Sequence, residues 1–394
     1  MKIAMIGQKG MPPTFGGVER HVHDISVRLF ALGHTVSVYA RNWYTKKDIT
    51  HVRGVEIIRL PSLHTKHLDT ISHVLLSTIH AMFRRVDIIH YHGVGPSLLS
   101  WIPRVFTPNI RVINTFHSVD RKHKKWGWFA RLVLRTGEWT ACTFAHRTIA
   151  VSQTISTYAE DVYNRTAHYI PNAVSLPEKG IATSTITPFG LQSQSYVLLV
   201  TRLIPHKGVQ YAITAWKKLE KEYPQIMAGK QLVVVGKGHY TNTYERRLQK
   251  MAESHKSIIF LGFQSGNTLQ QLFAHANCFI QPSDNEGMSL ALLEAMSHKL
   301  PVIASDIIEN IRLIKDPRML FRRSKSAALA KTLLHVLHLS AKEKKEIGMQ
   351  NYRIVTKDHT PEKVVQQLHD VYTAVFAQPS SRDEVCVPKP RTVA

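Results

Sequence analysis

Short apolar runs alternate with amphipathic helical patterns along most of this chain, and this alternation constrains the fold more than any other feature. The apolar run Lys2–Gly7 is followed by a helical pattern over Val18–Leu32 and then by a second apolar run, Thr35–Ala40. Repeated units of this kind fold into a parallel sheet with helices on both faces. The first half of the chain is therefore predicted to be a doubly wound α/β domain.

The same alternation starts again in the second half. A stretch rich in Ser, Thr, Pro and Gly, Pro177–Ser195, is typical of a linker, and the apolar run Tyr196–Thr201 follows it. We predict an α/β fold with domains at 1–180 and 190–360, a C-terminal helix at 361–377 that packs back toward the first domain, and a flexible tail at 378–394. Further strands are expected at Val55–Leu60, Val86–His90, Arg111–Thr115, Gln231–Gly236, Ile258–Leu261, Cys278–Ile280 and Pro301–Ala304.

The chain is strongly basic, with 51 Lys and Arg against 28 Asp and Glu and a formal net charge of +23. Such a balance suits three partners: a nucleic acid, an anionic membrane or a phosphate-bearing substrate. The three cysteines, Cys142, Cys278 and Cys386, lie far apart, which argues against a disulfide scaffold or a zinc knuckle. Since no apolar run is long enough to cross a membrane, we expect a cytoplasmic protein, with peripheral association to the inner face of the cell membrane as a further option.

A pair of cations follows the first strand of the second half. Arg202 and Lys207 lie five residues apart across a turn that contains Pro205, just before Gly208 and a helical pattern. Two fixed cations at the start of a helix suit a diphosphate, because Arg offers a planar fork and Lys a point charge. The alternative is a pair of solvated surface cations, the more common fate of a basic pair.

Two carboxylates flank the start of a later helix. Glu286 precedes an apolar helical pattern, and Glu294 lies eight residues further along, inside it. Backbone N–H groups at Gly287–Leu290 can bind a phosphate, while Glu286 can accept hydrogen bonds from sugar hydroxyls. The alternative is a helix that places one acid near its N-terminus and another on its polar face.

The first loop and one strand end supply further candidates. Small residues at Gly16 and Gly17 let backbone N–H groups approach an anion, although a plain loop that needs glycine is equally consistent. His117 follows an expected strand at the edge where α/β sheets bind ligands, but a chain with 23 His places several there by chance. His90 and His92 have a spacing that suits a metal, yet no third ligand is evident from the sequence.

Together these motifs resemble the retaining nucleotide-sugar glycosyltransferases of family 4, which have the GT-B fold of two Rossmann-like doubly wound domains facing across a cleft. The resemblance covers about residues 1–375, and the segment around Glu286 and Glu294 is its most specific part. Smaller motifs that agree are Gly16–Arg20, Pro171-Asn172, Gly236–Gly238, Phe260–Gly262 and Ala304–Asp306. The Gly7–Gly10 run and His117 with Lys125–Gly127 resemble a bacterial branch that builds surface polysaccharides, including rhamnosyltransferase-like members.

The resemblance implies a role for each matching residue. His117, Arg202, Lys207 and Glu286 would be catalytic, with the two cations neutralising the departing nucleoside diphosphate and Glu286 holding sugar hydroxyls. Glu294 would accept hydrogen bonds from the ribose. The remaining donor-binding residues would be Gly16, Gly17, Gly262, Gly287, Met288, Ser289 and Leu290.

The implied activity is that of a hexosyltransferase that moves a sugar, with retention, from a nucleotide-sugar donor to a glycan or lipid-linked acceptor in cell-surface polysaccharide synthesis. No cofactor and no metal are expected, because cations and helix N-termini can stabilise the leaving group. Ser118, His206, Lys237 and Ile308 depart from the usual pattern of the family, so the choice of sugar cannot be carried over.

A basic and aromatic segment, Arg121–Arg135, is a candidate for contact with a membrane or acceptor. Its residues Lys122, Lys124, Lys125, Trp126, Trp128 and Arg131 combine cations with aromatic rings. The same mixture suits a groove for single-stranded nucleic acid or an amphipathic core helix with snorkelling cations.

Two other functions remain open from the sequence. One is a basic nucleic-acid-binding protein, although no motif of that class is present and no nucleic-acid partner is expected. The other is a different GT-B enzyme such as a sugar-nucleotide epimerase.

Overall fold

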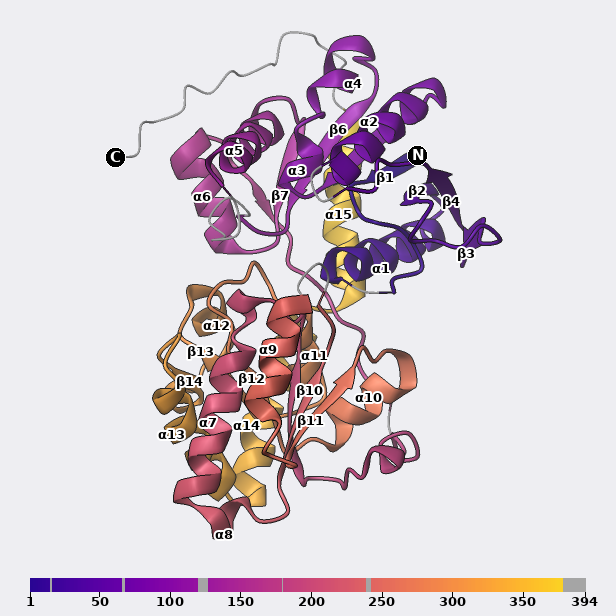
Figure 1. Cartoon of the computed structure of the whole chain (residues 1–394). Helices are drawn as coiled ribbons and strands as arrows, with labels where there is room; N and C mark the ends of the chain where they lie inside the picture. Colours follow the sequence, from indigo (N-terminus) through magenta and orange to yellow (C-terminus); the bar gives the residue numbers. More distant parts are fainter. Residues whose placement is uncertain (15, 66–67, 120–126, 179, 239–241, 378–394) are drawn as a thin grey trace. The chain divides into compact units, whose positions relative to one another are not determined.

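A computed structural model describes residues 1–14, 16–65, 68–119, 127–178, 180–238 and 242–377. The chain forms two compact units (Figure 1). Unit 1 comprises residues 1–172 together with the C-terminal segment from Pro361, and unit 2 comprises residues 173–360. Each unit contains one largely or wholly parallel sheet, as the strand–helix alternation predicts.

Unit 1 is built on an eight-stranded sheet in the order β3-β4-β2-β1-β5-β6-β7-β8. Every pairing is parallel except that of β3 with β4. Its strands are β1 (Lys2–Ile6), β2 (Thr35–Arg41), β3 (His51–Val52), β4 (Val55–Leu60), β5 (Ile88–His92), β6 (Arg111–Phe116), β7 (Arg147–Ala150) and β8 (His168–Tyr169). Its helices are α1 (Gly17–Ala31), α2 (Leu68–Phe83), α3 (Val94–Ser97), α4 (Trp101–Phe106), α5 (Trp128–Thr143), α6 (Gln153–Tyr163) and α15 (Pro361–Phe376).

Unit 2 is built on a six-stranded parallel sheet in the order β11-β10-β9-β12-β13-β14. Its strands are β9 (Tyr196–Val200), β10 (Gln231–Val235), β11 (Ile258–Gly262), β12 (Cys278–Gln281), β13 (Val302–Ser305) and β14 (Leu320–Phe321). Its helices are α7 (Val209–Glu222), α8 (Pro224–Met227), α9 (Asn242–Ala252), α10 (Gly266–His275), α11 (Leu290–Ser297), α12 (Ile308–Leu313), α13 (Ser326–His338) and α14 (Ala341–Asp358), with 3₁₀ turns at Thr187–Phe189, Pro205–Lys207 and Pro317–Met319.

Both sheets have a topological switch point, where the strand order reverses. In unit 2 it lies between β9 and β12, and in unit 1 between β1 and β5. Open α/β sheets bind ligands in the crevice outside the carboxyl ends of the strands at such a point. The loops that follow β9 and β12, and those that follow β1 and β5, are therefore the places where function is expected.

The C-terminal helix α15 belongs to unit 1. It contacts α1, and His34 Nε2 lies 2.9 Å from His369 Nδ1 of α15. The buried Tyr372 hydroxyl lies 2.6 Å from His90 Nδ1, so α15 reaches the strand at the switch point. The chain thus returns from unit 2 to complete the first domain, whereas the expected flexible tail at 378–394 lies outside the described residues.

The segment expected to be a linker is part of unit 2. Ile186 and Leu191 are buried in the core of that unit, and the Thr185 amide donates to Gln271 Oε1 at 2.8 Å. The linker prediction for 177–195 is therefore wrong over its described residues, and the division between units falls between Asn172 and Ala173. The polar composition of this segment suggested a linker, but a few apolar side chains among many polar ones are enough to pack a loop against a core.

Among the described residues, no helix combines the length and the apolar character needed to traverse a bilayer.

Candidate functional site

In unit 2, the loops after β9 and β12 approach each other very closely. Gly208 ends the first loop with a φ of 73°, and a Cβ atom at this position would lie 1.9 Å from the Pro282 carbonyl oxygen. The Asp284 amide donates to the His206 carbonyl oxygen at 2.8 Å. A residue other than glycine would push the loops apart, so Gly208 is what lets them meet.

An ion pair joins these two loops. Lys207 Nζ donates to both Oε1 and Oε2 of Glu286, each at 2.6 Å. Glu286 Oε1 also accepts hydrogen bonds from Gln281 Nε2 at 2.8 Å and from Ser283 Oγ at 2.7 Å. Because four donor contacts fix the Glu286 carboxylate, both charges are held at the switch point with little freedom.

Charge and burial oppose each other at Lys207. Its side chain is only 13% exposed, and burial lowers the pKa of its ammonium, while Glu286 raises that pKa and Arg202 lowers it. Arg202 is an exposed residue of the same loop. The sequence prediction that both cations lie at one place is consistent with this coupling, although Lys207 already has a carboxylate partner.

Helix α11 begins beside the ion pair. Its N-cap residue Ser289 accepts a hydrogen bond from the Leu292 amide at 3.3 Å and donates to Gln281 Oε1 at 3.3 Å. Glu294 lies in the middle of the helix and is buried, so the alternative of an acid on a solvated polar face is wrong. Gly287 is buried as well, whereas Met288 and Leu290 are half-buried.

Gly262, one of the predicted donor-binding residues, lies at the end of β11. Gly262 is exposed, has a φ of 64°, and accepts a hydrogen bond from the Gly236 amide at 2.7 Å. Gln264 Nε2 donates to the Leu261 carbonyl oxygen at 2.7 Å, which fixes the following turn.

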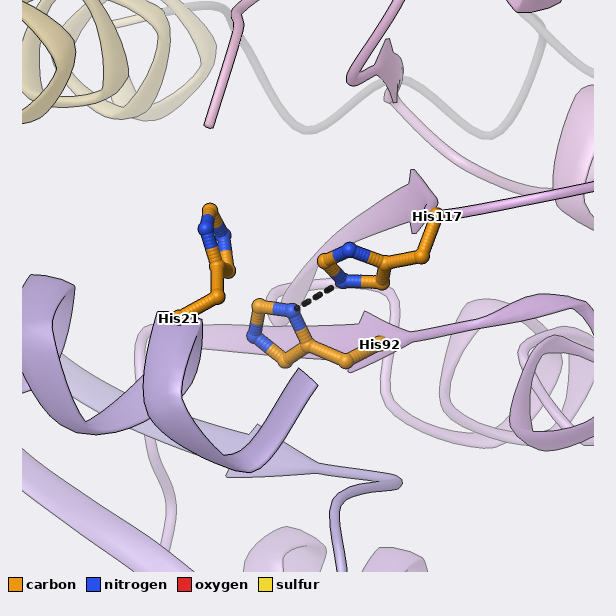
Figure 2. A group of neighbouring side chains, drawn as sticks. All are labelled: His21, His92 and His117. Carbon is orange, nitrogen blue, oxygen red and sulfur yellow. Dashed lines mark hydrogen bonds between the residues drawn. The ribbon is translucent and has the colours of Figure 1, made fainter. Parts of the chain in front are cut away.

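In unit 1, three histidines converge at the carboxyl ends of β5 and β6 (Figure 2). His92 ends β5, His117 follows β6, and His21 lies on α1. His92 Nδ1 lies 3.3 Å from His117 Nε2, and the His21 ring lies edge-on to His117 with centroids 5.0 Å apart. The sequence analysis named His117 and His92 but missed His21, which sits one residue beyond the Gly16–Arg20 motif.

Burial keeps these imidazoles from taking up protons. It lowers the pKa of His21 to about 4 and of His90 to about 3, and it holds the pKa values of His92 and His117 well below the usual range, with neighbouring histidines lowering those two further. Strand β5 runs two residues further than the expected strand Val86–His90, so it contains His92 as well as His90. His90 Nε2 lies 2.7 Å from Thr115 Oγ1, and His92 Nε2 lies 3.4 Å from Met5 Sδ.

The same three histidines are the described residues that could hold a metal ion. One nitrogen atom of each lies within 4.8 Å of the others. Neutral imidazole is a common ligand of Zn²⁺. The sequence showed no third ligand beside His90 and His92, because His21 and His117 come from other elements and meet His92 only in the fold.

The glycines of the first loop lie at the start of α1. Gly16 has a φ of 105°, and a Cβ atom there would lie 1.9 Å from Glu19 Oε2. Glu19 in turn accepts a hydrogen bond from the Lys9 amide at 3.2 Å. Gly17 is exposed. The loop therefore requires glycine at Gly16 for its conformation and leaves Gly17 open to a ligand.

Two family models match the chain, one in each unit. The model "Glycosyltransferase Family 4" matches residues 15–177, and the model "Glycosyl transferases group 1" matches residues 188–353. The chain is a family 4 glycosyltransferase. The expectation of an enzyme that transfers a glycosyl group is thereby confirmed.

The glycosyltransferase is similar to several known proteins. It is 24% identical over 340 residues to an uncharacterized glycosyltransferase of Methanocaldococcus jannaschii, covering 80% of this chain and 83% of the relative. It is 28% identical over 249 residues to the Escherichia coli UDP-Gal:alpha-D-GlcNAc-diphosphoundecaprenol alpha-1,3-galactosyltransferase, covering 59% and 61% of the two chains. A solved sucrose-phosphate synthase from Thermosynechococcus elongatus superposes with a TM-score of 0.80 at 20% identity, covering 95% of this chain and 99% of that one. This likeness confirms the GT-B fold class.

These matches give no support to the nucleic-acid-binding or epimerase alternatives. In this glycosyltransferase Arg202, Lys207, Glu286, Glu294 and the residues between the two acids belong to unit 2. Gly16, Gly17 and His117 belong to unit 1.

The predicted membrane or acceptor segment is only partly described. Trp128 and Arg131 lie at the start of α5, where Trp128 is 80% exposed and Arg131 is exposed. Lys122, Lys124, Lys125 and Trp126 lie outside the described residues.

Proposed function

We propose that this glycosyltransferase takes its sugar from a nucleoside diphosphate donor held at the switch point of unit 2. The observation that carries this proposal is the ion pair between Lys207 and Glu286, fixed by Gln281 and Ser283 and coupled to Arg202. A diphosphate competes with Glu286 for Lys207 and places its charge next to Arg202. The released Glu286 carboxylate then accepts hydrogen bonds from sugar hydroxyls.

The remaining donor contacts extend from this pair. The N-terminus of α11, from Gly287 to Leu290, supplies backbone N–H groups to the phosphate or sugar. Glu294, buried within the same helix, accepts from the ribose, and the turn at Gly262 receives the base. Gly16, Gly17 and His117 at the switch point of unit 1 are the further residues that the family resemblance implies for the donor and its sugar.

The transfer proceeds with retention and without a metal ion in this proposal. Cleavage of the anomeric C–O bond leaves negative charge on the diphosphate, which Arg202 and Lys207 stabilise as preorganised cations. Departure of the leaving group and entry of the acceptor on the same face preserve the configuration of the anomeric carbon.

A lipid-linked or glycan acceptor is proposed from the relatives, since the E. coli galactosyltransferase is named for a diphosphoundecaprenol-linked sugar. The proposed product is a cell-surface polysaccharide, and the enzyme would work at the inner face of the cell membrane. The rhamnosyltransferase-like branch is one option for the sugar.

A thermal-shift panel of UDP-, GDP- and dTDP-sugars tests the donor proposal. A donor at 100 times its dissociation constant stabilises the protein by about 2.7 kcal/mol, and only the correct base and sugar should reach this. Glu294→Ala should weaken the binding of that donor by about 1–3 kcal/mol, whereas Lys218→Ala on the exposed face of α7 is the matched control. No stabilisation by any nucleoside diphosphate sugar would contradict the proposal.

A further inference from the structure

Helix α2 of unit 1 is largely inverted, because it buries four polar side chains beside Val74 and Ala81 while its exposed side chains are apolar. Its buried residues are Asp69, His73, Val74, Ser77, Thr78 and Ala81. Its exposed residues are Leu68, Leu75, Leu76, Ile79 and Phe83, and Phe83 is 83% exposed. A surface helix in water shows the opposite arrangement, with its apolar stripe against the core.

The exposed residues of α2 form one continuous stripe. At the helical rotation of about 100° per residue, all five fall within an arc of about 100°. Ser72 lies inside this arc, but its hydroxyl donates to the Leu68 carbonyl oxygen at 2.7 Å. The stripe therefore presents hydrocarbon along four turns of helix.

Hydrogen bonds on the inner side hold the helix in this orientation. Asp69 accepts from Arg41 Nη1 at 2.8 Å, from Trp43 Nε1 at 3.0 Å and from Ser62 Oγ at 2.6 Å. The Thr78 hydroxyl lies 2.8 Å from the Tyr91 hydroxyl of β5. Turning the apolar stripe toward the core would break these buried contacts, which is costly. The exposure of the stripe is thus built into the packing of unit 1.

A second helix with exposed apolar residues lies beside α2. Helix α4 contacts α2, and the two helices lie side by side in unit 1 (Figure 1). Trp101, Val105 and Phe106 of α4 are exposed, and the Trp101 and Phe106 ring centroids lie 6.4 Å apart. We call the exposed apolar residues of the two helices the outer apolar face. It consists of Leu68, Leu75, Leu76, Ile79, Phe83, Trp101, Val105 and Phe106.

Charge at the border of this face is positive. Arg84 and Arg85 follow Phe83 directly and are exposed, with Arg84 paired to Glu56 at 2.8 Å. The one acidic residue of α2, Asp69, is buried, and α4 contains none. The first 170 residues carry 22 Lys and Arg against 10 Asp and Glu. An anionic surface that approached α2 and α4 would therefore find no exposed carboxylate on either helix. It would find the cationic side chain of Arg85 at the border.

We propose that the outer apolar face docks on the headgroup region of a bilayer that contains anionic lipid. Apolar and aromatic side chains enter the boundary between headgroups and acyl chains, while Arg84 and Arg85 remain at the level of the phosphates. A bilayer with anionic lipid is chosen over a protein partner because it offers hydrocarbon for the apolar side chains and phosphate for Arg85, and it meets no carboxylate from α2 or α4. Docking on the bilayer would bring the enzyme close to a lipid-linked acceptor. This benefit rests on the proposed function, whereas the docking surface itself does not.

Flotation of the full chain with vesicles tests this docking surface. One set contains phosphatidylcholine and phosphatidylglycerol in equal amounts, and the other contains phosphatidylcholine alone. The wild type should bind the mixed vesicles and bind the neutral ones more weakly. The double variant Leu76→Ser/Ile79→Ser should lower affinity for the mixed vesicles about tenfold or more.

A matched control exists in unit 2, where Ile308 and Ile311 of α12 are also exposed. The variant Ile308→Ser/Ile311→Ser should bind the mixed vesicles like the wild type. Equal loss in both variants, or no binding of the wild type, would overturn the proposal. So would a concentration-dependent dimer that the α2 variant alone dissolves, since this would assign the face to a second copy.

The donor thermal shift of the same variants separates this proposal from the proposed function. If vesicle binding fails while a nucleotide sugar still stabilises the protein, the docking surface is wrong and the donor site stands. If no donor stabilises a protein that binds vesicles through α2, the donor site is wrong and the docking surface stands.

Discussion

The two units place candidate functional residues at the switch points of similar sheets, yet one switch point holds charged side chains and the other holds neutral ones. At the switch point of unit 2 a cation and a carboxylate are buried together, with Gln281 and Ser283 supporting Glu286. At the switch point of unit 1 the polar groups are imidazoles whose pKa values burial holds low. One edge is prepared for an ionic ligand, whereas the other offers neutral hydrogen-bonding groups.

This difference suits the two edges to different kinds of chemical group. A preorganised cation stabilises a phosphate without having to be recruited from water, and its carboxylate partner is displaced rather than lost. Neutral imidazoles suit hydroxyl groups, because each ring nitrogen donates or accepts according to its tautomer. Four variants or conditions test this comparison.

The largest effect is expected from Lys207→Ala. Removing one preorganised charge from a developing oxyanion lowers turnover by about 100- to 1,000-fold. The Glu286 carboxylate keeps its hydrogen bonds from Gln281 and Ser283, so the melting temperature should change little. Steady-state turnover with the cognate donor is the measurement, and Lys218→Ala is the control. Full activity in Lys207→Ala would remove the diphosphate assignment.

A loss of stability is expected from Glu286→Gln. This change leaves the Lys207 ammonium, whose side chain is only 13% exposed, without its carboxylate, and the uncompensated charge should lower the free energy of unfolding by about 1–3 kcal/mol. Urea denaturation measures it. The double variant Lys207→Met/Glu286→Gln should recover part of the loss, because it removes both charges. If the single variant is as stable as the wild type, the pair is not the compensated unit described above.

A pH effect is expected in unit 1. Burial lowers the pKa of His21 to about 4 from the value of 6.5 expected when unfolded. The unfolded chain therefore binds a proton that the folded unit does not, and stability falls as the pH decreases from about 6.5 toward 4. His21→Asn should reduce this slope by up to about 1.4 kcal/mol per pH unit. Exposed His51→Asn is the control, and an identical slope in both variants would contradict the burial of a neutral His21.

The smallest effect is expected from removal of metal ions. If Arg202 and Lys207 carry the charge of the leaving group, dialysis against a chelator should leave turnover unchanged. The test can give either result, because His21, His92 and His117 could bind a divalent ion. A loss of activity that Zn²⁺ or Mn²⁺ restores would reject metal independence, and elemental analysis of the same samples would identify the ion.

The sequence predicted the fold because the fold follows from local pattern, and the same pattern indicated the candidate residues of the donor site. Alternation of apolar runs and helical periods predicted two parallel sheets, and most strand positions agree within two residues. Arg202, Lys207 and Glu286 were singled out because each lies in a loop between an expected strand and the helix that follows it. The linker prediction failed because Ile186 and Leu191 are isolated apolar residues in a polar stretch. Their burial in the core of unit 2 is visible only in the tertiary structure.

Two features came from tertiary structure alone. The third histidine of the unit 1 cluster, His21, lies about a hundred residues from His117, and only the folding of α1 against the sheet brings them together. The inversion of α2 likewise depends on Arg41, Trp43 and Tyr91, which hold its polar side from other elements.

The sequence by itself determined which residue types stand at the ends of strands, because side-chain period and strand boundaries are local properties. Only the tertiary structure decided which charges are compensated, which imidazoles are kept neutral and which apolar residues remain outside. Those outcomes depend on desolvation and on partners distant in the chain, and the free energy of a buried group is set by all of its neighbours together.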